Sequence, residues 1–222
     1  MTRVAVVVPA HDEQDLLPAC LAALAAAAAR IAPVPVEVIV VADACTDGTA
    51  ELAVAAGVEV LVTDARNVGH ARAAGMAHAL RHGPDDLWLA STDADTRVPA
   101  GWLDWHLRHA RAGAGLLAGT VEVDDWLSWP RALPDRYETR YRLTAAHVHG
   151  ANLGVDARAY LAAGGFPAVP YDEDRELVAR VRAAGGRVVT DTRCPVRTSA
   201  RPEGRAPLGF AAYLRDLAAE PA

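Results

Sequence analysis

Short apolar runs alternate with longer alanine-rich stretches through the first half of the chain. The short runs are apolar at nearly every position, which is typical of strands that are buried on both faces of a parallel sheet. These predicted strands cover residues 4–8, 36–41, 58–62 and 87–90. The longer stretches have apolar residues at helical spacing and begin with capping residues, so they predict helices over 12–30, 47–56 and 69–81. Four strands joined by three helices predict a doubly wound sheet over residues 1–98.

The second half of the chain has a less regular pattern. We expect a helix from Pro99 to about Gly113, strands over 116–123 and 150–155, a helix over 173–184 that ends at Gly185-Gly186, a strand over 187–190 and a last helix over 208–217. No repeat or linker divides the chain. The expected fold is a single α/β domain over residues 1–222, with a Rossmann-like, mostly parallel central sheet and helices on both faces.

The composition indicates a folded protein and removes several enzyme classes. With 222 residues, of which 52% are hydrophobic, the chain is long enough to bury a core. All 22 basic residues are arginine, because the sequence contains no lysine. This excludes a Walker-type phosphate loop and a Schiff-base lysine. The net charge of −6, from 22 basic and 28 acidic residues, and the dispersed arginines argue against binding to nucleic acid.

The cysteines and the N-terminal sequence indicate the cellular compartment of the protein. Cys20, Cys45 and Cys194 are odd in number and have no C-x-x-C spacing, so neither a disulfide framework nor a structural zinc site is expected. The apolar run before Pro9 is too short for a signal peptide, and no later stretch is apolar enough to span a bilayer. We therefore expect a cytoplasmic protein without a transmembrane span.

Acidic residues follow three of the four predicted strands. In an open parallel sheet, ligands bind beyond the carboxyl ends of the strands. These positions hold residues 9–13, 43–48 and 91–95. The turn after the first strand has no glycine, whereas a dinucleotide-binding sheet needs a glycine-rich turn there for the pyrophosphate to approach the helix N-terminus. A bound diphosphate would therefore need a cation held by carboxylates.

Asp93 and Asp95 are the candidate metal ligands. Residues two apart in extended backbone point to the same side, so these two carboxylates can converge on one ion across Ala94. Oxygen ligands suit Mg²⁺ or Mn²⁺. The alternative is that one of the two aspartates caps the helix expected from Pro99. The acidic ends of the neighbouring strands favour the metal site.

Five motifs, in chain order, resemble those of the family 2 glycosyltransferases, which have the GT-A fold. Residues 6–13 resemble the family's Pro-x-x-Asn-Glu turn, with Asp12 in place of asparagine. Residues 40–49 resemble its acidic stretch after the second strand, with Ala42, Ala44 and Cys45 as departures. The other three are Asn67-Val-Gly69 followed by Arg72, the metal motif Asp93-Ala-Asp95, and Glu173-Asp174 with Leu177, Arg180 and Gly185. The resemblance extends from about residue 3 to residue 190.

The resemblance implies a metal-dependent, inverting transfer of one sugar from a UDP- or GDP-linked donor to an acceptor hydroxyl. Residues 1–98 would bind the nucleotide sugar, and residues 99–222 would bind the acceptor and supply a C-terminal lid. The residues implied to hold the base and ribose are Pro9, His11, Glu13, Asp43 and Arg72. Asp95 would bind the metal directly, Asp93 would face the ribose or a metal-bound water, and Asp174 would act as the general base. The alternative for Glu173-Asp174 is a favourable interaction with the helix dipole alone.

The acceptor side is less well defined. The candidate contacts to a small-molecule or lipid-like acceptor are Trp102, His149, Asn152 and Glu173, and the alternative for tryptophans near a cleft is core packing. No histidine follows His149, so Thr198, Ser199 or water would replace the late histidine ligand of many relatives. The arginines of residues 198–205 would close over the phosphates.

Two other functions are compatible with the sequence. A sugar-nucleotide-binding protein that kept the GT-A fold and lost catalysis would explain the missing histidine. A nucleotidyltransferase has a similar sheet but normally begins with a glycine-rich loop that carries arginine and lysine, and this chain has no such loop.

Overall fold

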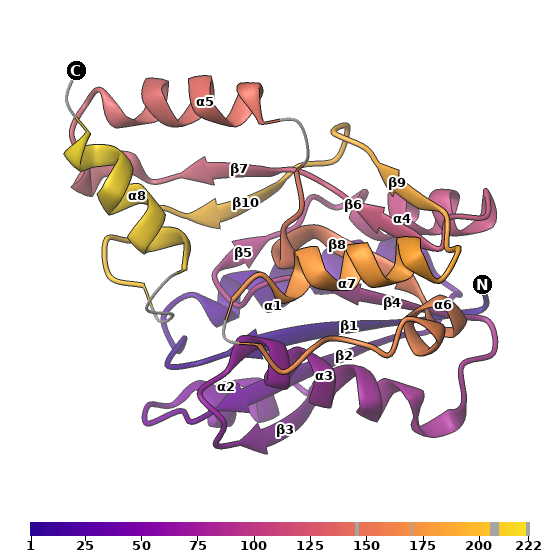
Figure 1. Cartoon of the computed structure of the whole chain (residues 1–222). Coiled ribbons are helices and arrows are strands. Elements are labelled where there is room, and N and C mark those ends of the chain that lie inside the picture. The colour runs from indigo at the N-terminus through magenta and orange to yellow at the C-terminus, as the bar shows by residue number, and fades with distance from the viewer. Residues whose placement is uncertain (145–146, 170, 205–208, 221–222) are drawn as a thin grey trace.

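Seven strands form the central sheet of the computed structural model, which describes residues 1–144, 147–169, 171–204 and 209–220. Their order across the sheet is β3-β2-β1-β4-β8-β6-β9 (Figure 1). The strands are β1 (Arg3–Ala10), β2 (Val36–Asp43), β3 (Glu59–Thr63), β4 (Leu87–Ser91), β6 (Leu116–Ala118), β8 (Leu153–Asp156) and β9 (Val188–Thr190). Only β8 pairs antiparallel with its neighbours, so the expected mostly parallel sheet is confirmed.

β1 lies inside the sheet and is buried on both faces. Val4, Val6 and Val8 pack into one hydrophobic cluster, and Ala5 and Val7 pack into a second cluster. Because successive side chains of a strand point to opposite faces, an unbroken apolar run is what a strand covered on both sides requires. The polar residues that follow β1 are therefore the first ones that a ligand can reach.

Helices cover both faces of the sheet. α1 (Leu17–Arg30), α2 (Thr49–Ala55) and α4 (Trp102–Arg111) pack into the cluster of Val4. α3 (Val68–Ala79), α6 (Ala157–Ala162) and α7 (Glu173–Ala183) pack into the cluster of Val7, and α7 crosses the front of the sheet in Figure 1. Within the described ranges, no helix has both the length and the hydropathy needed to cross a membrane.

A smaller sheet and two helices form a lobe at one end of the molecule (Figure 1). The small sheet has the order β5 (Thr96–Arg97), β10 (Val196–Ser199) and β7 (Val121–Asp124). α5 (Leu133–Leu143) and α8 (Phe210–Ala219) pack together over their own hydrophobic cluster. The 3₁₀ helices are η1 (Leu80–His82), η2 (Trp126–Ser128) and η3 (Gly150–Asn152). Because β10 pairs with β5, the C-terminal segment returns to the metal motif, which immediately precedes β5.

The prediction of a single strand over 116–123 is wrong. The chain divides at Gly119 and Thr120 into β6 of the large sheet and β7 of the small sheet. A Cβ added at Gly119 would overlap the side chain of Asn152, so the backbone passes unusually close to that amide. The strand expected over 150–155 is also partly wrong, because η3 comes first and β8 covers only its end.

Other differences lie at element edges. β3 was expected to be buried on both faces, but it is the edge strand of the sheet, and Val62 is 77% exposed. The helix expected from residue 12 begins at Leu17. The last helix begins at Phe210, and the expected start at residue 208 lies outside the described residues. β5, β10 and α6 were not predicted.

Candidate active site

Acidic side chains lie at the carboxyl ends of three neighbouring strands. Glu13 follows β1, Asp43 ends β2, and Asp93 and Asp95 follow β4. These strands are adjacent in the order β2-β1-β4. Pro9, by contrast, is buried within β1. The predicted position of the site, beyond the ends of a parallel sheet, is therefore occupied by carboxylates.

Arg72 connects the metal motif to helix α7. Its side chain is buried and forms ion pairs with Asp93 and Glu173, while its Nε donates to Ser91 Oγ at 3.1 Å. Burial works to lower the pKa of Arg72, but the two carboxylates outweigh it and raise that pKa. A Cβ added at Gly150 would overlap the guanidinium, so this glycine leaves the space that Arg72 fills.

Asp174 lies beside this network at the start of α7. Its Oδ1 accepts a hydrogen bond from the amide of Arg175 at 2.7 Å, and its Oδ2 accepts one from the amide of Gly150 at 2.8 Å. Burial raises the pKa of Asp174, although Arg72 and the amides oppose the shift. Glu173 is buried against Arg72, whereas Asp174 is partly exposed. Asp174 is therefore a positioned carboxylate of increased basicity, as a general base requires.

A second arginine, Arg201, contacts Asp95 and Glu13. Its guanidinium pairs with both oxygens of Glu13, and its Nη2 lies 3.2 Å from Asp95 Oδ2. Burial and the nearby Asp93 raise the pKa of Asp95 to about 7, against the opposing effect of Arg201. The environment of Asp95 therefore favours a neighbouring cation, and Arg201 supplies one positive charge. Arg205, the other arginine expected in the lid, lies outside the described residues.

The side chains around Asp95 fit a hard divalent cation. Asp93 and Asp95 offer carboxylate oxygens, and Thr198 Oγ1 lies 3.4 Å from Asp95 Oδ1. Oxygen-only ligands suit Mg²⁺ or Mn²⁺, and a cation would relieve the repulsion that raises the pKa of Asp95. Ser199 is placed differently, because its Oγ accepts a hydrogen bond from the amide of Arg201 at 3.2 Å.

His11 and Asp43 are joined on the other side of the site. His11 Nδ1 lies 2.7 Å from the carbonyl oxygen of Asp43. The Asp43 carboxylate accepts hydrogen bonds from Thr63 Oγ1 at 2.9 Å and from the amides of Ala65 and Asn67 at 2.7 and 2.8 Å. Burial opposes ionisation, but these hydrogen bonds prevail and lower the pKa of Asp43. Asp43 therefore anchors the loop that leads into α3.

Trp102 and Asn152 lie in the core, which corrects their expected contact with the acceptor. Both side chains are 0% exposed. Trp102 Nε1 donates to Asn152 Oδ1 at 2.8 Å, and Asn152 Nδ2 donates to the carbonyl oxygens of Thr120 and Cys194 at 2.9 and 3.0 Å. These bonds join α4, the β6–β7 connection and the segment before β10. Neither side chain is accessible to an acceptor.

His149 is partly exposed and neutral. Tyr141 Oη lies 3.0 Å from His149 Nε2, and the same hydroxyl accepts a hydrogen bond from the amide of Val121 at 3.0 Å. Burial lowers the pKa of His149 to about 4, so the ring carries no charge at neutral pH.

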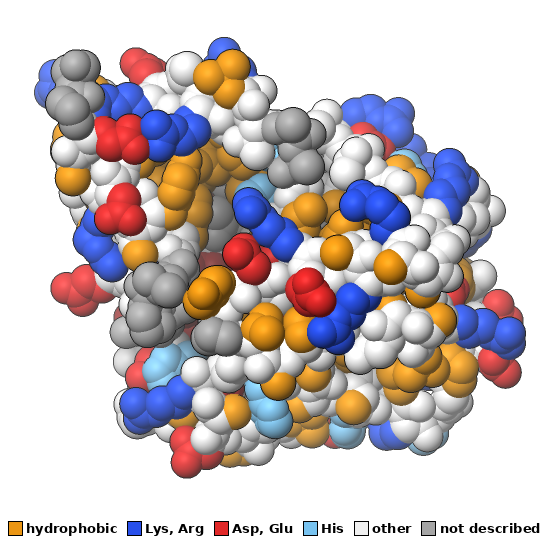
Figure 2. Space-filling model, in the orientation of Figure 1, with side chains coloured by type: hydrophobic (Ala, Val, Ile, Leu, Met, Phe, Trp, Pro, Cys, Tyr) orange, Lys and Arg blue, Asp and Glu red, His pale blue; other side chains and the backbone are white. Residues whose placement is uncertain are grey.

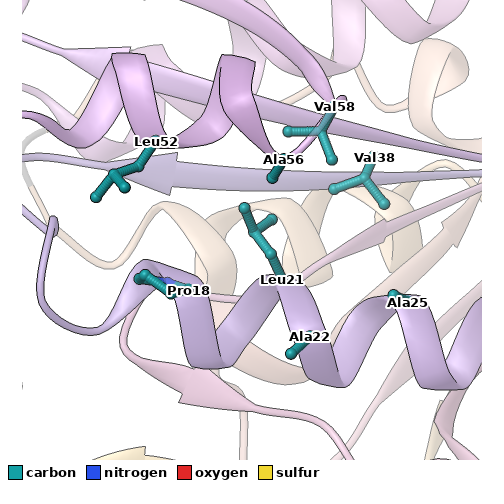
Figure 3. Close-up of a pocket in the computed structure, with 8 residues that line it drawn as sticks. All are labelled: Pro18, Leu21, Ala22, Ala25, Val38, Leu52, Ala56 and Val58. Atoms are coloured by element: carbon teal, nitrogen blue, oxygen red, sulfur yellow. The ribbon is translucent and has the colours of Figure 1, made fainter.

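A hollow and an apolar cavity on the described part of the chain differ in character. Figure 2 shows a hollow beside the α5–α8 lobe, with hydrophobic side chains on the lobe side and charged side chains on the opposite rim. An apolar cavity of about 350 Å³ lies elsewhere, between α1, α2 and β2 (Figure 3), and is lined by Pro18, Leu21, Ala22, Ala25, Val38, Leu52, Ala56 and Val58. This cavity contains none of the predicted site residues and has no ionisable lining side chain. We therefore assign the chemistry to the strand ends.

Comparison with known proteins identifies the family of this chain. The family model described as glycosyl transferase family 2 matches residues 5–160. The chain belongs to glycosyl transferase family 2. This family 2 glycosyltransferase is 31% identical over 193 residues to an uncharacterized glycosyltransferase of Mycobacterium tuberculosis (strain ATCC 25618 / H37Rv), a match that covers 84% of this chain and 82% of the relative.

Several solved structures of GT-A glycosyltransferases have a fold similar to that of this family 2 glycosyltransferase. S. aureus TarS 1-349 in complex with UDP-GlcNAc has a TM-score of 0.68 at 14% identity, over 94% of this chain and 61% of that one. The mannosyltransferase PcManGT from Pyrobaculum calidifontis, in complex with GDP-Man and Mn²⁺, has a TM-score of 0.67 at 21% identity, over 91% and 58%. Glucosyl-3-phosphoglycerate synthase from Mycobacterium tuberculosis, with Mn²⁺ and UDP, has a TM-score of 0.63 at 16% identity, over 99% and 81%. The expected GT-A fold is confirmed.

Two features of the site gave no clear signal in the sequence. The pairing of Arg201 with Glu13 joins residues 188 positions apart, and no local pattern reports it. Arg72 was expected on the nucleotide, but it is held between two carboxylates of the protein. The absence of lysine is the one sequence signal that bears on both contacts, because a permanently charged side chain that pairs with the acidic strand ends is then an arginine.

Proposed function

We propose that this family 2 glycosyltransferase moves one sugar from a UDP- or GDP-linked donor to an acceptor hydroxyl, with inversion at the anomeric carbon and with a divalent metal. One observation carries the proposal: Arg72 pairs with Asp93 of the metal motif and with Glu173, the neighbour of Asp174. This link brings the candidate metal ligands and a candidate base to one site. Structures of similar fold hold UDP-GlcNAc, UDP with Mn²⁺, or GDP-Man with Mn²⁺, which supports this class of donor.

The donor half is proposed to comprise residues 1–98. His11, which follows β1, would contact the nucleoside, and Glu13, which is buried and paired with Arg201, would position that arginine. Asp43 would act through the loop that it anchors before α3, and Arg72 would act through its hold on Asp93. Because Asp43 and Arg72 are buried, their proposed role is to position groups that the donor touches.

Asp95 is proposed to hold Mg²⁺ or Mn²⁺, with Asp93 beside it and the Thr198 hydroxyl nearby. When bound, such an ion draws negative charge from a departing diphosphate. Arg201 already contacts Asp95, so it would share this carboxylate or turn toward the phosphate oxygens. Its planar guanidinium suits a bidentate contact with phosphate.

Asp174 is proposed as the general base. It would take the proton from the acceptor hydroxyl while the hydroxyl oxygen attacks the anomeric carbon from the face opposite the diphosphate. One displacement of this kind inverts the configuration. The acceptor half would comprise residues 99–222, where His149 offers a neutral, partly exposed imidazole and Glu173 positions Arg72. The hydrophobic side chains on the lobe side of the hollow in Figure 2 support a small or lipid-like acceptor.

The proposal is tested first on the donor and then on the base. A thermal-shift screen of UDP- and GDP-sugars with Mn²⁺ identifies the donor, and NMR of the product gives its anomeric configuration.

Asp174→Asn is expected to lower turnover about 10²- to 10⁴-fold with donor Kd unchanged. Asp172→Asn, at an exposed position beside the same helix start, is the matched control. Retention of more than about a tenth of turnover by Asp174→Asn, or a product of retained configuration, contradicts the mechanism.

The position of Arg201 favours a second candidate, a sugar-nucleotide-binding protein without catalysis. Arg201 supplies charge at Asp95, and no histidine follows His149 in the sequence. Calorimetric titration with UDP and GDP, with and without Mn²⁺, separates the two candidates when it is combined with an acceptor panel. Nucleotide binding without hydrolysis or transfer would favour the binding protein.

A further inference from the structure

Two loops at the edge of the proposed donor site bring an imidazole, a carboxylate and a thiol together. His11 and Asp12 follow β1, and Cys45 follows β2. One ligand atom from each of these three residues lies within 4.8 Å of the other two, and all three side chains are partly exposed. This group offers nitrogen and sulfur as well as oxygen, unlike the oxygen-only site at Asp93 and Asp95.

The His11 ring is held in the orientation that metal-binding histidines adopt. Its Nδ1 lies 2.7 Å from the carbonyl oxygen of Asp43, and a carbonyl can only accept, so Nδ1 carries the hydrogen. In the neutral ring the lone pair is then on Nε2, which lies 4.0 Å from Asp12 Oδ2. A hydrogen bond from one ring nitrogen to a backbone carbonyl is the usual support for a histidine that binds metal through the other nitrogen.

Asp12 and Cys45 are held together by the backbone. The amide of Asp12 donates to Cys45 Sγ at 3.4 Å, and the thiol donates to the carbonyl oxygen of Ala10 at 3.4 Å. The amide of Thr46 donates to Asp12 Oδ1 at 2.6 Å and lowers the pKa of that carboxyl, so Asp12 is ionised at neutral pH. Burial raises the pKa of the Cys45 thiol, and the Asp12 amide favours the thiolate.

We propose that His11, Asp12 and Cys45 form a site for a borderline divalent cation such as Zn²⁺, with water as a fourth ligand. Tetrahedral Zn²⁺ bonds of roughly 2.0 to 2.3 Å put ligand atoms about 3.4 to 3.6 Å apart, so the ligand atoms, which lie within 4.8 Å of one another, must close by at most about 1.4 Å. When sulfur binds the cation, the thiol proton leaves to solvent. Thiolate and imidazole favour Zn²⁺ over Mg²⁺ or Mn²⁺, which separates this site from the one at Asp95.

The site has a consequence that rests on the proposed function. His11 is proposed to contact the donor nucleoside, so a cation on its Nε2 would occupy part of the donor site. Zn²⁺ is therefore expected to compete with UDP or GDP, whereas Mn²⁺ at Asp95 supports their binding. The metal site itself stands on the three side chains and does not require the proposed function.

Cobalt reports the site directly, because Co²⁺ bound to a thiolate gives a near-ultraviolet charge-transfer band. Titration of the reduced, full-length chain with Co²⁺ is expected to produce this band, and Zn²⁺ is expected to abolish it. Cys45→Ser should lose the band, and Cys194→Ser, which changes a buried cysteine away from the site, should keep it. His11→Gln should weaken Co²⁺ binding by at least about tenfold, since loss of a supporting partner alone typically weakens metal binding 10- to 100-fold.

Each arm has an outcome that overturns its claim. No band in the wild-type chain, or a band that persists in Cys45→Ser, overturns the metal site. Asp95→Asn should keep the band, and its loss there would mean that Co²⁺ binds at the metal motif instead. A normal band with no effect of Zn²⁺ on UDP affinity overturns the competition and leaves the metal site in place. Failure of UDP to bind even with Mn²⁺ counts against the proposed function alone.

Discussion

At the scale of single residues, Arg201 carries the positive charge that two enclosed carboxylates need. Glu13 is 5% exposed, and Arg201 pairs with it and with Asp95. Removing one partner of a buried ion pair leaves the other charge uncompensated, so Arg201→Met is expected to lower the free energy of unfolding by about 2 to 3 kcal/mol. Urea unfolding at neutral pH measures this loss.

A control substitution at Arg197, in β10, shows whether the loss at Arg201 comes from the burial of its ion pairs or from the removal of any arginine charge. Arg197→Met removes an arginine whose pair with Glu122 at 3.4 Å is exposed, and it is expected to cost less than about 1 kcal/mol. Mn²⁺ should restore more stability to Arg201→Met than it adds to the wild-type chain, because it replaces the missing charge. Equal losses in the two variants would contradict the role given to Arg201.

His106 makes the stability of the fold depend on pH. Burial lowers its pKa to about 3, and Trp88 Nε1 donates to its Nδ1 at 3.1 Å, so the native ring is neutral. The unfolded chain has a histidine pKa of about 6.5. Between these values the unfolded state binds a proton that the native state excludes, so the free energy of unfolding falls as pH falls, by up to about 1.4 kcal/mol per pH unit.

The glutamine variant isolates this contribution. His106→Gln keeps an acceptor for Trp88 but cannot titrate, and the other titrating groups are common to both proteins. The difference in unfolding free energy between wild type and variant, measured by urea at pH 7, 6 and 5, should therefore shrink as the solution is acidified. Parallel pH profiles would rule out a neutral, buried His106.

At the scale of elements, Gly119 separates two strands that the sequence pattern runs together. A Cβ at this position would overlap the Asn152 amide, which is fixed by its own hydrogen bonds. Gly119→Ala is therefore expected to lower the free energy of unfolding by about 1 to 3 kcal/mol, the usual cost of overpacking. Gly101→Ala is the matched control, because nothing lies within 4 Å of a Cβ added there. Thermal unfolding of both variants tests whether the close approach at Gly119 is the cause.

Local periodicity predicted the first half of the fold but not the way distant strands pair. The four parallel strands and three helices follow from runs that report burial on both faces, such as β1. β5 and β10 are short, and their pairing joins segments about a hundred residues apart, so no local sequence pattern predicts them. In the site, the strand-end position of Asp95 was predictable, because strand ends converge in a parallel sheet. The burial of Trp102 was not, because helical spacing alone does not say which face meets the core.

At the scale of the whole molecule, Arg72 joins the two halves of the chain. It projects from α3 of the first half to Glu173 on α7 of the second, and it also contacts Ser91 and Asp93. Lysine keeps the charge but lacks the planar fork that reaches these partners together. Arg72→Lys is therefore expected to lower the free energy of unfolding by about 2 to 3 kcal/mol, because a buried carboxylate loses its partner. It should also weaken UDP binding in the presence of Mn²⁺, because Asp93 loses the contact that positions it.

Two measurements on one variant separate stability from positioning. Urea unfolding gives the first effect of Arg72→Lys, and calorimetric titration of the folded variant with UDP and Mn²⁺ gives the second. Arg81→Lys makes the same chemical change in a surface pair with Glu37, so both quantities should match the wild type. If Arg72→Lys is destabilised but binds UDP normally, Arg72 only holds the halves together. If both quantities fall, the same guanidinium stabilises the fold and positions the metal motif beside Asp174, as a site shared between the two halves requires.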